Sequence, residues 1–380
     1  MNRVDVEPTL LVWARERAGY GVESLLGRFP RLERWERGEV QPTLKQLERF
    51  ARTTHVPVGY LFLREPPVEE IPIPDLRTVA SRGAGEPSPD LLDTLYLCQR
   101  RQAWYREFAR STGEESLAFV GSAHLDDPIE ETAARIRDAL GFDLEARRRA
   151  PAWTDALRLF IGEADRAGVL VMVSGVVGSN NHRPLDPEEF RGFALADDLA
   201  PLVFLNGADT KAAQMFSLAH ELAHIWLGET ALSDVGPASR PTQRVESWCN
   251  QVAAELLVPI AALREAAPPG DSLEAVQDLA RRFKVSTLVI LRRLLDARRL
   301  SRDEFEEAYT RELRRLLARP RGSGGNFYLT QAVRLSRRFA RALVASTLEG
   351  QTLYRDAFRM LGVRKESTFL ELGRSLGYPV

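Results

Sequence analysis

Two histidines four positions apart constrain this chain more than any other feature. They flank a glutamate in the segment His220-Glu221-Leu222-Ala223-His224. On an α-helix, residues at i and i+4 project from the same face, so both imidazoles reach a single ion. The 380 residues contain only five histidines, and two of them have this spacing. The segment therefore predicts a helix that carries part of a metal site.

The flanking residues indicate where this helix begins and ends. Leu202–Leu205 favours a strand, Asn206-Gly207 a turn, Asp209 or Thr210 an N-cap, and Gly228 a helix stop. Apolar residues then recur at spacings of three and four, namely Phe216, Ala219, Ala223 and Leu227. Such a stripe is typical of a helix that packs against a core. We expect a buried helix over Lys211–Leu227.

The residue types favour zinc. Two imidazoles from one helix are common zinc ligands, and Glu221 stands where it can take a proton from a water molecule that the metal activates. A catalytic zinc ion usually has three protein ligands. We expect the third from a helix over 242–258, where Glu246 is the first candidate. A closed structural zinc site would use cysteines and leave Glu221 without a role.

The same helix carries one alternative ligand and one supporting residue. Glu255 is the alternative, but its apolar neighbours favour a solvated or packing carboxylate. Asn250 lies one turn after Glu246 and is predicted to hold a ligand imidazole or the carboxylate.

These motifs resemble the ImmA/IrrE family of zinc metallopeptidases. The resemblance is carried by the HELAH helix and by the stretch Glu246-Ser247-Trp248-Cys249-Asn250 to Val258-Pro259. It implies a zincin-like core in an α+β chain, with zinc held by His220, His224 and Glu246 and with Glu221 catalytic. The segment Trp35-Glu36-Arg37-Gly38-Glu39, followed by Pro42-Thr43-Leu44, resembles the XRE-type helix-turn-helix domain fused to many such peptidases.

Patterning divides the chain into five segments. Helical spacing, proline-rich stretches and an arginine-rich end mark a helical module at 1–65, a linker with an amphipathic helix at 66–126, the peptidase core at 127–265, a helical region at 266–310 and a helical C-terminal region at 311–380. Helices and strands alternate in the core without a regular βαβ rhythm, which favours α+β. Its expected strands are Val169–Val173, Phe190–Leu195 and Leu202–Leu205, and its expected helices include Ile129–Leu140 and Ala152–Ala167.

Two helical regions suggest nucleic-acid binding. In the N-terminal module, Arg31, Arg34 and Arg37 alternate with glutamates that would oppose phosphate, so DNA binding and docking of a partner remain equal alternatives. Val276–Leu295 also has a helix-turn-helix-like pattern, for which packing behind the active site is the preferred interpretation.

The charge is unevenly distributed. The net charge of −1 excludes a uniformly basic protein, yet residues 311–341 contain nine arginines and one acidic residue. Phe327 and Tyr328 lie inside this stretch, next to a glycine-rich hinge at Gly322–Gly325. Cations interleaved with aromatic rings suit single-stranded DNA, a candidate activator that the resemblance also implies. A solvated pair of basic helices is the alternative. The candidate contacts are Phe327, Tyr328, Arg334, Arg337, Arg338 and Arg341.

The two cysteines, Cys98 and Cys249, are too few for a disulfide framework and favour a reducing cytoplasm. No signal peptide or membrane-length apolar run is found, so we expect no membrane partner. Cys98 lies on the amphipathic segment Leu91–Arg110 and is a candidate inhibitory zinc ligand, with core packing as the alternative.

The resulting expectation is a cytoplasmic zinc endopeptidase. The resemblance implies cleavage of a transcriptional repressor of the XRE type, which would derepress genes for stress response, mobile elements or phage defence. The alternative is a DNA-binding transcriptional regulator whose zinc site is structural or vestigial.

Overall fold

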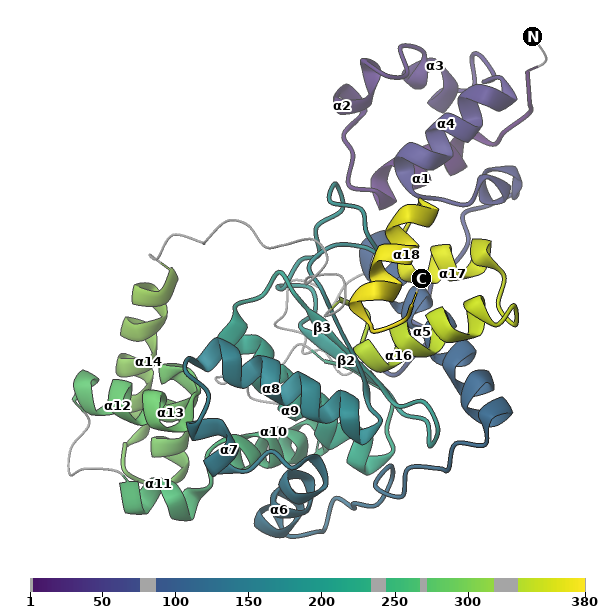
Figure 1. Ribbon diagram of the computed structural model, residues 1–380. Helices are drawn as coiled ribbons and strands as arrows, with labels where there is room; N and C mark the ends of the chain where they lie inside the picture. The colour runs from purple at the N-terminus through teal and green to yellow at the C-terminus, as the bar shows by residue number, and fades with distance from the viewer. Residues whose placement is uncertain (1–2, 76–86, 234–243, 267–271, 318–333, 380) are drawn as a thin grey trace. The chain divides into compact units, whose positions relative to one another are not determined.

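Contacts within the chain divide it into two units. One comprises Met1–Pro72 with Gly85–Asp93, and the other comprises Ile73–Ala84 with Thr94–Val380. The structure is a computed structural model that describes residues 3–75, 87–233, 244–266, 272–317 and 334–379 (Figure 1).

The first unit is built from short helices around an aromatic core. Phe29, Trp35 and Phe50 pack with ring centroids 5.5–6.5 Å apart. Thr43 caps α4 and forms a capping box with Gln46, as the sequence indicates. The helices are α1 (Pro8–Arg17), α2 (Val22–Leu26), α3 (Leu32–Glu36), α4 (Leu44–Thr54) and the 3-10 helix η1 (Val58–Phe62).

A four-stranded mixed sheet is the scaffold of the second unit. The strands are β1 (Leu170–Ser174), β2 (Gly192–Leu195), β3 (Leu202–Asn206) and β4 (Ala231–Ser233), in the order β1-β3-β2-β4. β1 pairs parallel with β3, whereas β2 pairs antiparallel with both β3 and β4. All strand residues are buried, so both faces of the sheet are covered.

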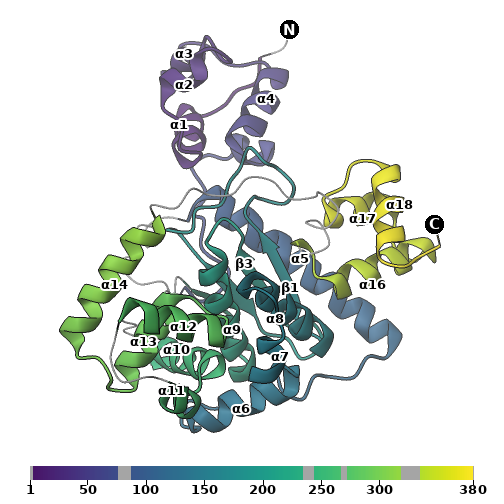
Figure 2. The ribbon, with the colours of Figure 1, turned by 60° about the vertical axis from the view of Figure 1, so that its left-hand side comes forward.

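Different helices cover the two faces of the sheet. Val203 and Leu205 of β3 belong to the same core cluster as residues of α8 (Trp153–Ala167) and α9 (Lys211–Leu227). Side chains alternate along a strand, so Phe204 faces the other way. On that other face, Arg101 of α5 (Pro89–Thr112) contacts the sulfur of Met172 in β1. Figures 1 and 2 show α5 across the sheet from α8.

Further helices surround α9. α10 (Arg244–Leu257) packs against α9 and against α6 (Ile129–Leu140), and α13 (Thr287–Asp296) packs against α12 (Leu273–Phe283) and α14 (Arg302–Leu317). The short helix α7 (Leu144–Arg148) follows α6 in the sequence, and the short helix α11 (Ile260–Ala266) follows α10. The C-terminal helices are α16 (Arg337–Leu348), α17 (Tyr354–Leu361) and α18 (Glu366–Ser375).

The mixed α+β class agrees with the sequence prediction. The helix over Lys211–Leu227 has the expected bounds, because the Thr210 side chain caps its start and Gly228 ends it at a φ of +72°. β4 is an addition that the sequence analysis did not predict. The predicted hinge Gly322–Gly325 lies outside the described residues. Among the described helices, none is both long and apolar enough to cross a membrane.

Candidate metal centre

Helix α9 buries its two histidines and the glutamate between them. His220 and His224 have no exposed surface, and Glu221 is 1 % exposed. The two imidazoles lie one turn apart, and their Nε2 atoms are separated by 3.0 Å. Two histidines thus turn the same ring nitrogen toward one point inside the core.

Helix α10 adds a carboxylate to this point. The Oε2 atom of Glu246 lies 3.3 Å from Nε2 of His220, and Oε1 lies 3.1 Å from Nε2 of His224. Burial opposes ionisation of Glu246, but the two histidines outweigh it and lower its pKa to about 2. Burial lowers the pKa of His224. Glu246 is therefore an anion that faces two imidazoles.

This triangle of donor atoms fits a metal ion. Ligands about 2.0–2.2 Å from a tetrahedral zinc lie about 3.3–3.6 Å from one another, close to the separations found. Among the described residues, His220, His224 and Glu246 are the group of His, Cys, Asp or Glu that brings three ligand atoms within 4.8 Å. Within those same residues neither Nδ1 atom has a hydrogen-bond partner. The site thus has a divalent-cation donor set of two nitrogens and one carboxylate.

Glu221 lies beside this group against strand β2. An added Cβ at Gly192 would lie 3.0 Å from Oε1 of Glu221 and 2.9 Å from the carbonyl oxygen of Phe204. Only glycine therefore leaves room for the carboxylate. Burial, and then the negative charge of Glu246, raise the pKa of Glu221 well above its ordinary value. The sequence analysis missed Gly192. A glycine inside a strand often marks a place where another group approaches the backbone closely, and this signal could have identified it.

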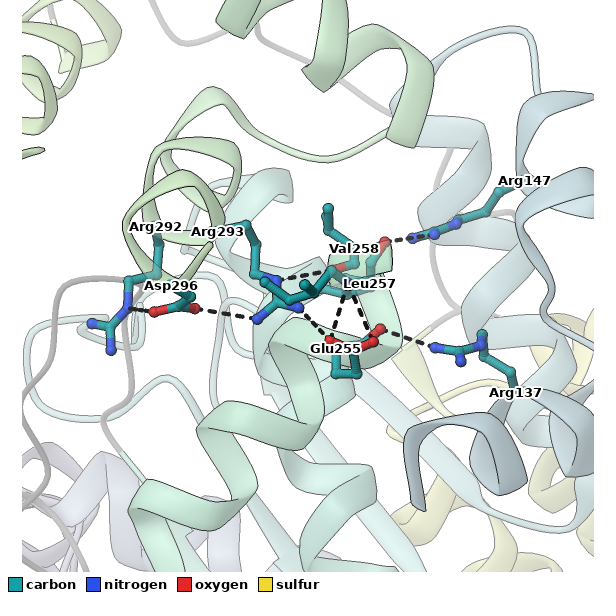
Figure 3. Close-up of polar contacts among 9 residues, drawn as sticks. Arg137, Arg147, Glu255, Leu257, Val258, Arg292, Arg293 and Asp296 are labelled. Atoms are coloured by element: carbon teal, nitrogen blue, oxygen red, sulfur yellow. Dashed lines mark hydrogen bonds and ion pairs between the residues drawn. The ribbon is translucent and has the colours of Figure 1, made fainter. Parts of the chain in front are cut away.

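The other buried glutamate of α10 has different partners. Glu255 forms an ion pair with Arg293 and accepts hydrogen bonds from the Ile260 amide at 3.2 and 3.3 Å. Figure 3 shows Glu255 and these partners at the C-terminal end of α10, and Glu246 lies nine residues earlier on the same helix. The structure thus favours Glu246 over Glu255 as the third ligand. Glu255 is an ion-paired carboxylate and not a solvated one.

Three arginines bind the last carbonyl groups of α10. Arg137 donates to the carbonyl of Glu255 at 2.9 Å, Arg147 to that of Leu257 at 2.6 Å, and Arg293 to that of Val258 at 2.8 Å (Figure 3). They satisfy carbonyls that a helix end leaves without partners. We name this set, with Glu255, the arginine cluster. No sequence motif predicted the arginine cluster, because its members lie up to 156 positions apart.

The predicted role of Asn250 has no hydrogen bond to support it among the described residues and stays a prediction. Its Oδ1 atom is buried without a hydrogen-bond partner among the described residues. No bond joins its side chain to either imidazole or to Glu246 in that part of the chain. The residue lies on helix α10 one turn after Glu246, as the sequence indicates.

Cys98 lies on the wrong side of the sheet to bind the metal. It lines a small cavity with Phe204, Arg101 and Arg334, on the face that α5 covers. Burial raises the pKa of its thiol to about 12. The expected inhibitory ligand is thus a buried core residue, because the strands separate it from α9. Cys249 is likewise buried in the core.

Two of the six candidate nucleic-acid residues form hydrogen bonds inside the chain. Arg338 binds Glu114 at 2.7 Å and the Tyr105 hydroxyl at 2.6 Å. Arg341 donates to the Leu376 carbonyl at 2.8 Å, and its guanidinium lies over the Tyr378 ring. Arg337 is exposed, whereas Arg334 lines the cavity of Cys98. Phe327 and Tyr328 lie outside the described residues. Binding of single-stranded DNA stays a prediction.

The other two candidate DNA-binding regions differ. In the first unit, Arg34 pairs with Glu39 and Arg37 with Glu33, each at 3.1 Å, so glutamates neutralise these cations as the sequence indicated. In the second, the apolar side chains of 276–295 belong to the core cluster that also contains α9. This region has the packing role that the sequence analysis preferred.

Two family models match parts of the chain. Residues 164–295 match the IrrE N-terminal-like domain, and this range includes α9, α10 and all residues of the metal centre. Residues 335–375, which contain α16–α18, match a domain of unknown function (DUF8813). Neither match covers the first unit, so no family match supports the expected helix-turn-helix fusion. Comparisons with curated proteins and with solved structures found no match.

The match over 164–295 bears on the activity. It supports a metallopeptidase domain of the ImmA/IrrE type, in agreement with the resemblance that the HELAH helix carries. The fold, the buried donor triangle and the family match thus point to the same segment of the chain.

Proposed function

We propose that this chain is a zinc-dependent endopeptidase that cleaves a transcriptional repressor. One observation carries the peptidase part: the donor atoms of His220, His224 and Glu246 converge beside the buried carboxylate of Glu221. A closed structural site would need a fourth protein ligand. No fourth ligand atom joins the group among the described residues, and Glu221 would then have no chemical role.

Each residue has a distinct task in the hydrolysis. His220, His224 and Glu246 hold the metal, and the negative Glu246 offsets part of its charge. Bound zinc supplies a Lewis acid that polarises the peptide carbonyl and favours ionisation of water. A cation held by the neighbouring ligands would offset the burial and the charge of Glu246, so that Glu221 is ionised, takes the proton of the attacking water and passes it to the leaving nitrogen. Gly192 leaves the space in which that carboxylate stands.

The substrate part of the proposal rests on the resemblance to ImmA/IrrE peptidases. A repressor of the XRE type is the expected substrate, and its cleavage would derepress the genes that it controls. The regulatory role is a hypothesis that depends on this one substrate class.

Glu221→Gln tests the chemistry with the smallest structural change. The zinc-loaded full chain is incubated with XRE-type repressors from the same genome, and cleavage is followed by mass spectrometry. We expect the variant to lose about 100- to 10,000-fold in rate, because it lacks the general base. Glu229→Gln changes an exposed glutamate just after α9 and is the matched control, for which we expect the wild-type rate.

The outcomes separate the parts of the proposal. Equal repressor cleavage by wild type and Glu221→Gln would reject the catalytic assignment. Cleavage of an unfolded test protein without cleavage of the repressor would keep the peptidase and reject the substrate. Unchanged gene regulation in cells that carry Glu221→Gln would instead favour a DNA-binding regulator with a structural or vestigial zinc site.

A further inference from the structure

A cavity of 430 Å³ opens at the start of the metal-binding helix and has no assigned role. Its lining comes from the first residues of α8, α9 and α13, from the end of α12 and from α14. No metal ligand lines it, and His220 lies eight residues beyond Ala212, the residue of α9 in its wall, which is about 12 Å along the helix axis. Ligand sites typically have roughly 300–1,000 Å³. We name this cavity the basic pocket.

The charged residues of the basic pocket all have the same sign. Arg281, Lys284 and Arg315 line it, and no aspartate or glutamate does. Arg281 pairs with Asp278 and Arg315 with Glu312. Lys284 differs, because its Nζ atom reaches the Pro151 carbonyl at 3.5 Å and has no carboxylate partner among the described residues. The pocket therefore keeps an uncompensated positive charge.

Two helix starts add to this positive charge. α9 begins at Lys211 and α13 at Thr287, and neither has an acidic residue in its first turn. The start of a helix has a partial positive charge and attracts anions, phosphate groups in particular. Ala212, Ser286 and Thr287 place these two starts in the wall of the pocket. Both helix starts thus lie in the wall of the same cavity as Lys284.

The remaining wall is apolar and includes one accessible aromatic ring. Pro151, Ala212, Ala280 and Val285 provide aliphatic surface. Trp153 at the start of α8 lines the pocket and remains 39 % exposed, which is unusual for so large an apolar side chain. An exposed indole is a stacking surface for a flat ring.

We propose that the basic pocket binds a small phosphorylated molecule with a flat ring, the chemistry of a nucleoside monophosphate. The phosphate lies against Lys284 and the starts of α9 and α13, and the ring packs on Trp153. The site is separate from the metal centre, so its occupancy does not depend on the proposed peptidase activity.

Calorimetric titration of the full chain with the four common nucleoside monophosphates tests this assignment. We expect saturable binding of at least one of them, about tenfold or more tighter than binding of its nucleoside or of inorganic phosphate, because each fragment makes only half of the contacts. Lys284→Gln and Trp153→Leu should each weaken binding about tenfold or more. Arg282→Gln is the matched control, since Arg282 is an exposed neighbour that does not line the pocket, and it should bind as wild type.

Three results would overturn the proposal. The first is the absence of saturable binding of all four nucleotides at about 1 mM. The second is wild-type affinity in both pocket variants, whose intact fold is checked by an unchanged melting temperature and zinc content. The third is tight binding of a single-stranded oligonucleotide together with no binding of any monophosphate, which would assign the surface to a polymer.

Discussion

Helix α10 carries two buried glutamates, of which one pairs with an arginine and the other faces two histidines. Glu246 near its start is 2 % exposed, and Glu255 near its end is 5 % exposed. Glu255 has a cation of its own chain, Arg293, and a backbone amide. Glu246 faces two imidazoles, and within the described residues no lysine or arginine pairs with it.

The difference shows how one helix serves both stability and chemistry. A buried carboxylate is costly unless it has a hydrogen-bonded partner of opposite charge. At the end of α10 the arginine cluster supplies that partner permanently, and the same arginines bind the helix carbonyls (Figure 3). At the start of α10 the carboxylate of Glu246 faces the two imidazoles, at the position where we propose a metal ion. The arginine cluster thereby holds in place the helix that presents Glu246.

Removal of the cation from the arginine cluster should have the largest effect. Arg293→Met leaves Glu255 buried without its charge partner, which we expect to lower the free energy of unfolding by about 3–5 kcal/mol. Urea denaturation measures this loss. The double variant with Glu255→Met should recover much of it, because no unpaired charge then remains. A loss below about 1 kcal/mol in the single variant would show that the pair is not needed.

A methyl group at Gly192 should slow the cleavage that depends on Glu221 without loss of zinc. Gly192→Ala forces the carboxylate of Glu221 or the strand to move, so we expect cleavage to slow by about 10- to 100-fold. Zinc content should stay at the wild-type value, since no ligand changes. Gly162→Ala, where a Cβ meets no atom within 4 Å, is the control and should retain full activity. Wild-type cleavage by Gly192→Ala would remove Glu221 from its assigned position.

Arg147 should matter less than Arg293, although it is more deeply buried. Its Nε and Nη1 atoms have no partner among the described residues, and burial lowers its pKa to about 9. Arg147→Met loses the bond to Leu257 but also relieves the cost of a buried charge. We expect the unfolding free energy to change by less than about 1.5 kcal/mol. A loss as large as that of Arg293→Met would place both arginines in the same role.

Cys98→Ser should have the smallest effect. Since the sheet separates Cys98 from α9, we expect unchanged zinc affinity and unchanged basal cleavage in the variant. A rise in basal activity would contradict the position of Cys98 and restore its inhibitory role. The native thiol should also react slowly with a thiol reagent at pH 8, because burial raises its pKa to about 12.

Local sequence signals predicted the parts that depend on neighbouring residues. The bounds of α9 followed from Thr210, Gly228 and an apolar stripe. The stretch from Glu246 to Asn250 predicted that the third ligand, Glu246, comes from the helix that follows the two histidines. β4, by contrast, is three residues long and has no periodicity to detect.

The errors concern contacts between distant segments. Cys98 was placed near the metal because a helix sequence does not tell which face of a sheet it covers. The state of Glu255 depends on Arg293, 38 residues later, and no pattern links the two. The Arg338 contact with Glu114 spans 224 residues and was hidden in the same way.

Zinc bound per chain is the most direct test of the metal centre. The wild type, His224→Ala, Glu246→Ala and Glu229→Ala are loaded with zinc, dialysed and measured by elemental analysis. We predict one zinc ion per chain for the wild type and for Glu229→Ala, and a strong loss for the two ligand variants. Full zinc content in Glu246→Ala, or none in the wild type, would contradict the assignment of His220, His224 and Glu246 as the metal ligands.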